Sequence, residues 1–230
     1  MTAFTERSGE KRRGVEGVRL VRFGLYLWMR IFHGLQFHGI ENIPKTGPVL
    51  VAANHPSYFD PVVLSLATDR VVRFFALAEI LKVPIVGWFA KQWGMLPVYP
   101  GGNNEPTVQK ALRVLQRGGA IGIFPEGRRS LQWAMGEARP GIGRLAVQSG
   151  ARIVPCVIYG TWKAWPRLTG LPHPAKIVVD FLPPVDVEPV DTRENHEEIA
   201  RRVRELIVAE QLKHRVGPAP TGAYREAPDY

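Results

Sequence analysis

The chain has 230 residues, 45% hydrophobic and 22% charged, a composition that excludes a largely disordered protein and suits one α/β domain rather than two. Thirty Lys and Arg against 21 Asp and Glu give a net charge of +9, which indicates an anionic partner such as nucleic acid, a phosphorylated substrate or an acidic bilayer. Cys156 is the only cysteine, so an intrachain disulfide and a Cys-rich metal cluster are excluded. Its place in the apolar run IVPCVI predicts a buried side chain.

Residues 1–14 are polar and lack the apolar core and cleavage site of a signal peptide, so we expect a flexible N-terminus on the cytoplasmic side. Residues 15–38 are the most hydrophobic stretch, but arginines interrupt it before it reaches the roughly 20 apolar residues that span a bilayer. A helix here would gather apolar side chains together and direct its arginines to another side, near lipid phosphates. The gathered residues are Leu20, Phe23, Leu27, Trp28, Ile31 and Leu35. This pattern predicts an amphipathic membrane-docking helix; the alternative is a helix packed on its own domain.

Residues 39–215 are expected to form the main domain, because short apolar runs alternate there with helical patterns. The runs predict strands at 48–54, 73–77, 94–98, 120–124, 152–158 and 176–181. Helical spacing appears at 106–117, 141–149 and 193–214, the last with Ile199, Val203, Leu206 and Ile207 facing inwards. The alternation predicts an α/β fold with a mixed, largely parallel sheet flanked by helices. Residues 216–230 turn to Pro, Gly and Ala, and we expect a flexible tail.

The loop at residues 54–60 follows a predicted strand and opens a helix, a place where α/β folds commonly bind ligands. His55 and Asp60 lie five residues apart across a turn that contains proline, so their side chains can approach each other. A carboxylate can keep one imidazole nitrogen protonated, which leaves the other to accept a proton from a substrate hydroxyl. The alternative is that Asp60, followed by Pro61, only caps the helix and His55 is an ordinary loop residue.

A second polar cluster, FPEGRRS, follows the predicted strand at 120–124. The turn at Glu126 and Gly127 offers backbone N–H groups, and Arg128 and Arg129 can hold phosphate oxygens. Adjacent arginines are more often simply solvated. Here, however, both polar clusters come directly after buried strands, so we expect them to face one cleft.

NHPSYFD at 54–60 and FPEGRRS at 124–130 together resemble the glycerolipid acyltransferase family, typified by 1-acylglycerol-3-phosphate acyltransferase. The segment VPCVI at 154–158 resembles the family's fourth block, and residues 139–141 resemble the segment after its third block. The resemblance covers roughly residues 39–181. The first and third blocks, in this order and at this spacing, are highly specific.

The resemblance implies an O-acyltransferase that acylates the free hydroxyl of lysophosphatidic acid. His55 would deprotonate that hydroxyl, and Asp60 would orient and charge-stabilise the imidazole. The acyl donor would be acyl-CoA or acyl-carrier protein. A thioester is already an activated acyl group, so we expect neither a cofactor nor a metal.

The resemblance also implies the substrate-binding residues. Glu126 and Gly127 would shape the acceptor site, with Arg128 or Arg129 near the phosphate. Pro155 would help to wall the acyl-donor side.

Two departures from the family pattern put the acceptor lipid in doubt. The family's second block commonly ends in an arginine that binds substrate phosphate, whereas this chain has Pro100 at that position. The third block usually has Thr where this chain has Arg128. We expect Arg128, or else Lys91, to supply the missing cation.

Acyl transfer to lysophosphatidic acid at the cytoplasmic face of the cell membrane is therefore the leading hypothesis, with the protein peripheral or monotopic. Its partners would be an anionic membrane surface, the lysophospholipid and the acyl donor. An acyltransferase for another hydroxyl-bearing lipid, such as a glycolipid or amino-acid lipid, is the alternative. A catalytically idle membrane-binding module is disfavoured because both polar clusters are complete. Nucleic-acid binding is disfavoured because the basic residues are scattered or lie near the N-terminus.

Overall fold

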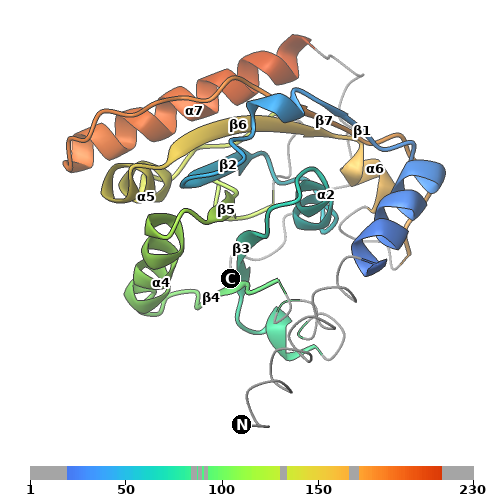
Figure 1. The fold of residues 1–230 in the computed structure, drawn as a ribbon, viewed down its shortest axis with the longest axis horizontal. Coiled ribbons are helices and arrows are strands. Elements are labelled where there is room, and N and C mark those ends of the chain that lie inside the picture. Colours follow the sequence, from blue (N-terminus) through green and yellow to red (C-terminus); the bar gives the residue numbers. More distant parts are fainter. Residues whose placement is uncertain are drawn as a thin grey trace, which may run out of the picture.

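The computed structural model describes residues 20–83, 87, 90, 93–129, 134–165 and 171–213 (Figure 1). The described part contains strands and α-helices in the alternation that the sequence predicts, together with two short 3-10 helices. In chain order they are a helix at residues 20–32, β1 (Gln36–His38), η1 (Ile40–Asn42), β2 (Val49–Ala53), α2 (Asp60–Leu66), β3 (Val72–Leu77), η2 (Ile80–Lys82), β4 (Leu96–Val98), α4 (Glu105–Gln116), β5 (Ala120–Ile123), α5 (Gly141–Ser149), β6 (Arg152–Tyr159), α6 (Thr161–Ala164), β7 (Val178–Phe181) and α7 (Arg193–Lys213).

The strands form one seven-stranded sheet in the order β1-β7-β6-β2-β5-β3-β4. β6 and β7 are antiparallel, and every other neighbouring pair is parallel. The mixed, largely parallel sheet flanked by helices that the sequence predicts is therefore confirmed. Parallel neighbours end at the same edge of a sheet, so the loops that follow β2 and β5 are brought together.

Helices cover both faces of the sheet, and β2 at its centre is buried along its whole length (Figure 1). Leu50 and Ala52 join the apolar cluster of α4, α5 and α7. Val51 and Ala53 join the cluster of α2, α6 and the helix at 20–32. Successive side chains of a strand point to opposite faces, so a continuous apolar run is what a strand buried on both faces requires.

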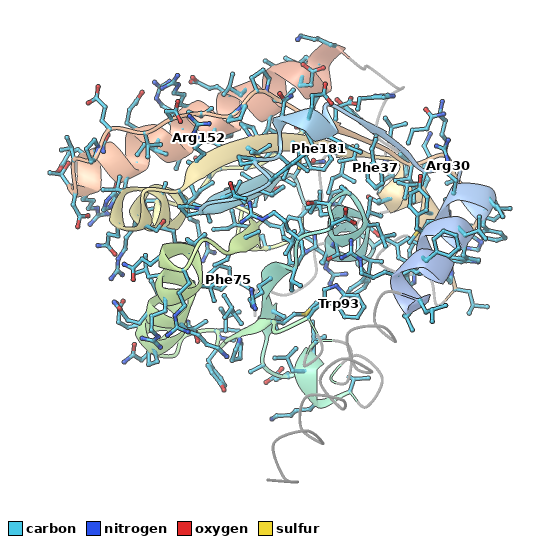
Figure 2. The ribbon with its side chains drawn as sticks, viewed as in Figure 1. Arg30, Phe37, Phe75, Trp93, Arg152 and Phe181 are labelled. Atoms are coloured by element: carbon cyan, nitrogen blue, oxygen red, sulfur yellow. The ribbon has the colours of Figure 1, made fainter. Side chains whose placement is uncertain are left out.

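Aromatic side chains mark the same division into two faces. Phe37 and Phe181, on the neighbouring strands β1 and β7, lie with ring centroids 6.4 Å apart in the cluster around α2. Phe75 packs on the other face, against the cluster around α4 (Figure 2).

Cys156 is fully buried in β6, as predicted. Burial raises the pKa of its thiol well above the usual value, so it is an inert core side chain.

The predicted N-terminal helix is shorter than expected at its end. It stops at Phe32, Gly34 takes a positive φ of 55°, and Gln36–His38 pairs with β7 as strand β1. A residue in the left-handed region ends a helix, and glycine adopts it without steric cost. The prediction of one helix to residue 38 was wrong because three strand residues are too few to show a period of two.

The exposed side of this helix is apolar, and two of its arginines donate hydrogen bonds to backbone carbonyl oxygens. Leu20, Phe23 and Ile31 have exposed fractions of 72%, 65% and 76%. Arg22 donates to the carbonyl oxygen of Ser65 at 3.0 Å, and the Arg30 guanidinium donates to a carbonyl of its own chain at 2.6 Å. Backbone carbonyls therefore engage part of the donor capacity of both guanidinium groups, and the expectation that these arginines lie near lipid phosphates stays a prediction.

The other predicted helices lie within one residue of their expected bounds, as α4, α5 and α7. Within α7, Val203 and Ile207 are fully buried, whereas Leu206 is 37% exposed. Leu206 was expected to face inwards, but the helix turns by 100° per residue and places it at the border of the buried stripe. None of the described helices is long and apolar enough to cross a bilayer.

Candidate active site

The two polar clusters of the sequence meet at the carboxyl edge of the sheet. His55 follows β2 by two residues, and Glu126 follows β5 by three. β2 and β5 are parallel neighbours with Ala52 opposite Ile123. A backbone contact joins the loops: the N–H of His55 donates to Oε1 of Glu126 at 3.3 Å.

His55 and Asp60 form a hydrogen-bonded pair, with Nδ1 of His55 2.7 Å from Oδ2 of Asp60. The same oxygen accepts the N–H of Ser57 at 2.7 Å, and the Asp60 side chain is fully buried. A carboxylate only accepts hydrogen bonds, so Nδ1 carries the proton and Nε2 is left as the acceptor. Nε2 makes no hydrogen bond to any described residue. The pair can therefore take a proton from a bound hydroxyl group.

The alternative prediction that Asp60 only caps the helix is wrong. Asp60 is the first residue of α2, and no side chain caps that helix. Its carboxylate instead turns back onto the preceding loop, where it fixes the backbone of Ser57 and the ring of His55. Pro61 is tolerated in the first turn because the N–H it lacks has no partner within a helix there.

An aromatic stack supports the imidazole ring from beneath. The rings of His55 and Phe124 lie parallel with centroids 3.8 Å apart, and Phe124 stacks on Phe74 at 5.8 Å. Phe74 lies directly over Gly122 of β5, where an added Cβ would come within 2.0 Å of the Phe74 ring. Only glycine therefore fits at residue 122. Phe124, the phenylalanine of the FPEG motif, orients the His55 ring by stacking on it. The sequence did not predict this role.

Glu126 is buried and joins three segments of the site. Its Oε1 accepts the N–H of His55, and its Oε2 accepts the N–H of Gly136 at 3.0 Å. Gly127 has a positive φ of 70°, which glycine adopts without cost. Glu126 therefore holds the loop of His55 through a backbone N–H group, a contact that its predicted role of shaping the acceptor site did not include.

The C-terminal helix α7 secures the segment that Glu126 contacts. Nε of Arg204 donates to the carbonyl oxygen of Gly136 at 2.8 Å. The side-chain oxygen of Gln211 accepts the N–H of Met135 at 2.9 Å. Sequence reasoning missed both residues, because nothing in an amphipathic helix pattern shows which of its polar side chains reaches a distant loop.

Arg128 and Arg129 differ in their surroundings. Arg128 is exposed. The Arg129 guanidinium carbon lies 3.7 Å above the centroid of the Tyr58 ring, and its enclosed Nη1 has no hydrogen-bond partner among the described residues. Tyr58 belongs to the same loop as His55. The structure thus brings one predicted arginine onto the loop that carries the predicted base.

The remaining predicted residues lie elsewhere or are not described. Pro155 is buried inside β6, opposite Ala52 of β2, and its carbonyl oxygen accepts the N–H of Leu182 at 2.8 Å. Lys91 lies outside the described residues. Pro100 is exposed in the turn after β4.

An aromatic cluster connects the helix at 20–32 with the loop at residues 54–60. Phe59 lies at its centre, with ring centroids 6.2 Å from Trp28, 5.5 Å from His33 and 4.9 Å from Trp165. His33 is 1% exposed, and its ring lies beside the backbone of Ala175. Burial therefore lowers the pKa of His33, because it disfavours the charged imidazolium.

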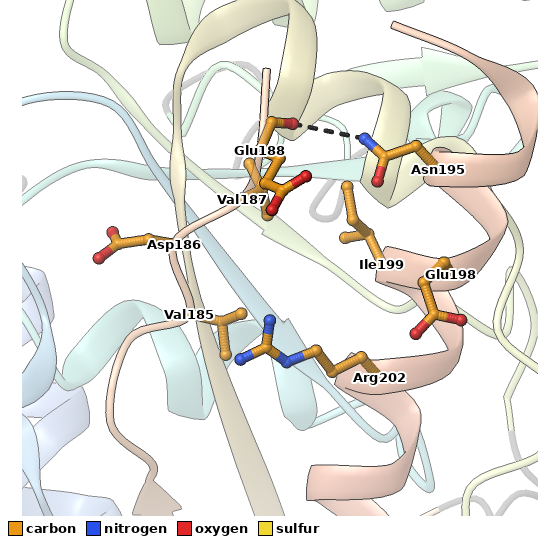
Figure 3. Close-up of a pocket in the computed structure, with 8 residues that line it drawn as sticks. All are labelled: Val185, Asp186, Val187, Glu188, Asn195, Glu198, Ile199 and Arg202. Carbon is orange, nitrogen blue, oxygen red and sulfur yellow. Dashed lines mark hydrogen bonds between the residues drawn. The ribbon is translucent and has the colours of Figure 1, made fainter. Parts of the chain in front are cut away.

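A shallow cavity of about 230 Å³ lies away from this site, between residues 185–188 and α7 (Figure 3). Its walls mix apolar, acidic and basic side chains, and Asn195 spans it by donating to the carbonyl oxygen of Glu188 at 3.4 Å. It contains no residue of either predicted motif. Within the described ranges, no group of three His, Cys, Asp or Glu side chains is placed to hold a metal ion.

The model of the family described as Acyltransferase matches residues 34–159. That span is more than half of the chain, and it includes both motifs and the sheet strands that carry them. The chain belongs to the acyltransferase family. The resemblance noted in the sequence is therefore confirmed.

Several curated proteins are similar to this acyltransferase-family chain. A chloroplastic 1-acyl-sn-glycerol-3-phosphate acyltransferase of Arabidopsis thaliana is 28% identical over 147 residues, which are 61% of this chain and 41% of that protein. An enzyme of the same name from Borreliella burgdorferi is 29% identical over 125 residues, 54% of this chain and 50% of that protein. An uncharacterized protein of Mycobacterium tuberculosis is 29% identical over 199 residues, 76% and 52% of the two chains. The chain thus spans about half of these relatives or less.

A solved structure has a similar fold. The crystal structure of the 1-acyl-sn-glycerophosphate acyltransferase of Thermotoga maritima matches with a TM-score of 0.75 and 24% identity, covering 91% of this chain and 84% of that one. At this identity the match concerns the fold, and it agrees with the mixed sheet described above.

Proposed function

We propose that this protein is an O-acyltransferase that moves a fatty acyl group from acyl-CoA or acyl-carrier protein to the free hydroxyl of lysophosphatidic acid, forming phosphatidic acid. The hydrogen-bonded pair of His55 and Asp60 carries the proposal, because its 2.7 Å contact leaves Nε2 of the imidazole as a base. The names of the similar enzymes support the choice of acceptor.

The proposed reaction needs one base and no enzyme nucleophile. Nε2 of His55 takes the proton of the acceptor hydroxyl while the hydroxyl oxygen attacks the thioester carbonyl carbon. The new C–O bond forms, the tetrahedral intermediate collapses, and the C–S bond breaks. The imidazolium then returns its proton to the leaving thiolate. The buried carboxylate of Asp60 keeps Nδ1 protonated and stabilises the imidazolium between these steps.

The phosphate of the acceptor is assigned to the arginines after β5. Arg129 is the stronger candidate because its guanidinium is partly enclosed, contacts Tyr58 of the loop that carries His55, and has no carboxylate partner among the described residues. Arg128, exposed beside it, is the second. Guanidinium groups bind phosphate oxygens through two parallel hydrogen bonds. Together they would supply the cation that the family's second block provides and Pro100 does not.

The protein is proposed to act at the cytoplasmic face of the membrane, docked by the helix at 20–32. Three apolar side chains of that helix, Leu20, Phe23 and Ile31, are more than 60% exposed, and an apolar helix face of this kind favours the lipid interface. The aromatic cluster around Phe59 would connect the docked helix to the catalytic loop. A lysolipid could then reach His55 from the bilayer while the donor arrives from the cytosol.

A second candidate function is acyl transfer to a lipid without a phosphate monoester. The observation that favours it is Pro100, which stands where the family commonly has a phosphate-binding arginine. The core chemistry at His55 would be unchanged.

The experiment is acyl transfer by purified protein in detergent micelles with labelled oleoyl-CoA. Lysophosphatidic acid is offered beside a phosphate-free monoacylglycerol and a lyso-glycolipid, with His55→Ala as the control. Phosphatidic acid from the wild type and none from the variant supports the proposal. Acylation of only a phosphate-free acceptor favours the second candidate, and turnover by His55→Ala refutes the assigned base.

A further inference from the structure

The contact between Arg129 and Tyr58 has a geometry that the acid–base pair does not explain. The guanidinium carbon lies 3.7 Å from the centroid of the Tyr58 ring, so the cation sits against the aromatic face. Tyr58 is itself 43% exposed, which means that the fold does not depend on burying this ring. Its side chain also contacts Trp165, with ring centroids 5.6 Å apart.

An aromatic face holds a guanidinium group in a way that a carboxylate cannot. A carboxylate would accept the N–H groups and cancel the charge, and a phosphate would then have to compete with it. The quadrupole of a ring attracts the cation while leaving its N–H donors for another partner. Arg129 fits this description, since its Nη1 is enclosed without a partner among the described residues.

The loop fixes Tyr58 relative to the base. The residue before it, Ser57, donates its N–H to the buried carboxylate of Asp60 at 2.7 Å. The Ser57 hydroxyl donates to the carbonyl oxygen of Trp165 at 3.0 Å and accepts the N–H of Phe59. The backbone before Tyr58 is thereby tied to the carboxylate that orients His55, and the backbone after it is tied to the Ser57 hydroxyl.

We propose that Tyr58 is a positioning residue for acceptor recognition: its ring holds the Arg129 guanidinium at a set distance from His55, ready to bind the acceptor phosphate. This assignment rests on the proposed function. In a glycerol-based acceptor the hydroxyl and the phosphate are held a few bonds apart, so a base and a cation held at a set separation can select both groups together. Arg129 itself comes from the loop after β5, and its contact with the Tyr58 ring holds its guanidinium beside the loop of His55.

The test is a double-mutant cycle on the 230-residue chain in detergent micelles, with oleoyl-CoA and lysophosphatidic acid. The variants are Tyr58→Leu, Tyr58→Phe, Arg129→Gln and Tyr58→Leu with Arg129→Gln. We expect Tyr58→Leu to raise the KM for lysophosphatidic acid about three- to tenfold, the range of a partly desolvated cation–π contact, with a smaller change in kcat. Tyr58→Phe keeps the ring and should retain most of the affinity.

The decisive result is the coupling. Once Arg129→Gln has removed the cation, Tyr58→Leu should raise the KM no further, since the ring acts through that cation. Independent, multiplicative effects would overturn the proposal, as would a Tyr58→Phe variant as impaired as Tyr58→Leu. Wild-type turnover with an unchanged KM in Tyr58→Leu refutes only the role of Tyr58. A wild type that never acylates lysophosphatidic acid refutes the proposed acceptor, and this assignment with it.

Discussion

Replacing Asp60 with asparagine isolates the contribution of its negative charge. Oδ2 of Asp60 accepts hydrogen bonds from His55 and Ser57, whereas Oδ1 is buried and has no hydrogen-bond partner among the described residues. An asparagine can place its carbonyl oxygen where Oδ2 lies and its NH₂ where Oδ1 lies. Both hydrogen bonds and the tautomer of His55 then persist, and only the charge is lost.

The magnitude follows from the charge separation during the reaction. When His55 takes the hydroxyl proton, its imidazolium lies beside the Asp60 carboxylate, and two opposite charges about 4 Å apart attract by about 4 kcal/mol at an effective dielectric constant near 20. At about 1.4 kcal/mol for each factor of ten, Asp60→Asn should lower kcat roughly 10²- to 10³-fold. The KM for the acceptor should change little, because the imidazole is neutral when the acceptor binds.

The assay is initial-rate kinetics with oleoyl-CoA and lysophosphatidic acid in micelles, accompanied by a thermal melt. The melting temperature should stay level or rise, since a fully buried carboxylate with an unpaired oxygen is costly to desolvate. His55→Ala, which removes the base itself, is the matched control and should lose more activity. A folded Asp60→Asn variant with kcat within about threefold of wild type would refute the reasoning. A rise in KM alone would place Asp60 in substrate binding instead.

Four further predictions concern the loop after β5, the buried His33 and the exposed face of the helix at 20–32. Glu126→Gln should lower both kcat and the melting temperature, because an amide can accept only one of the two backbone N–H groups that the carboxylate now accepts, and a buried unpaired donor costs about 1–3 kcal/mol; kinetics and a melt check it. Arg128→Ala should raise the KM for lysophosphatidic acid, although less than loss of the enclosed arginine beside it, and an unchanged KM contradicts its role. His33 has a lowered pKa in the fold, so the unfolded chain binds more protons as the pH falls below about 6.5; the wild type should lose melting temperature between pH 7.5 and 5.5, and His33→Phe should lose less. Phe23→Ser with Ile31→Ser should weaken sedimentation with anionic liposomes without changing turnover in micelles, and equal sedimentation refutes the docking face.

The sequence was most informative where structure is set locally. Each strand from 48–54 to 176–181 was predicted within about two residues, because continuous apolar runs bounded by Gly, Pro or polar turns are typical of strands buried on both faces. The pairing of His55 with Asp60 was also predictable, since it spans one short turn. Strand β1 was missed because its three residues gain their structure only by pairing with β7, far along the chain.

Contacts between distant segments were decided by the tertiary structure. Glu126 is 71 residues from His55, and its motif predicts a turn near a ligand, but not that both its oxygens hold backbone N–H groups. The stack of Phe124 on His55 and the position of Arg129 over Tyr58 likewise need the parallel pairing of β2 and β5 to exist. The sequence alone was therefore enough to predict the fold class, the two motifs and the contact of His55 with Asp60, because these depend on local patterns. Which arginine contacts the loop of His55, and what holds that loop in place, depend on strands that meet only in the folded chain.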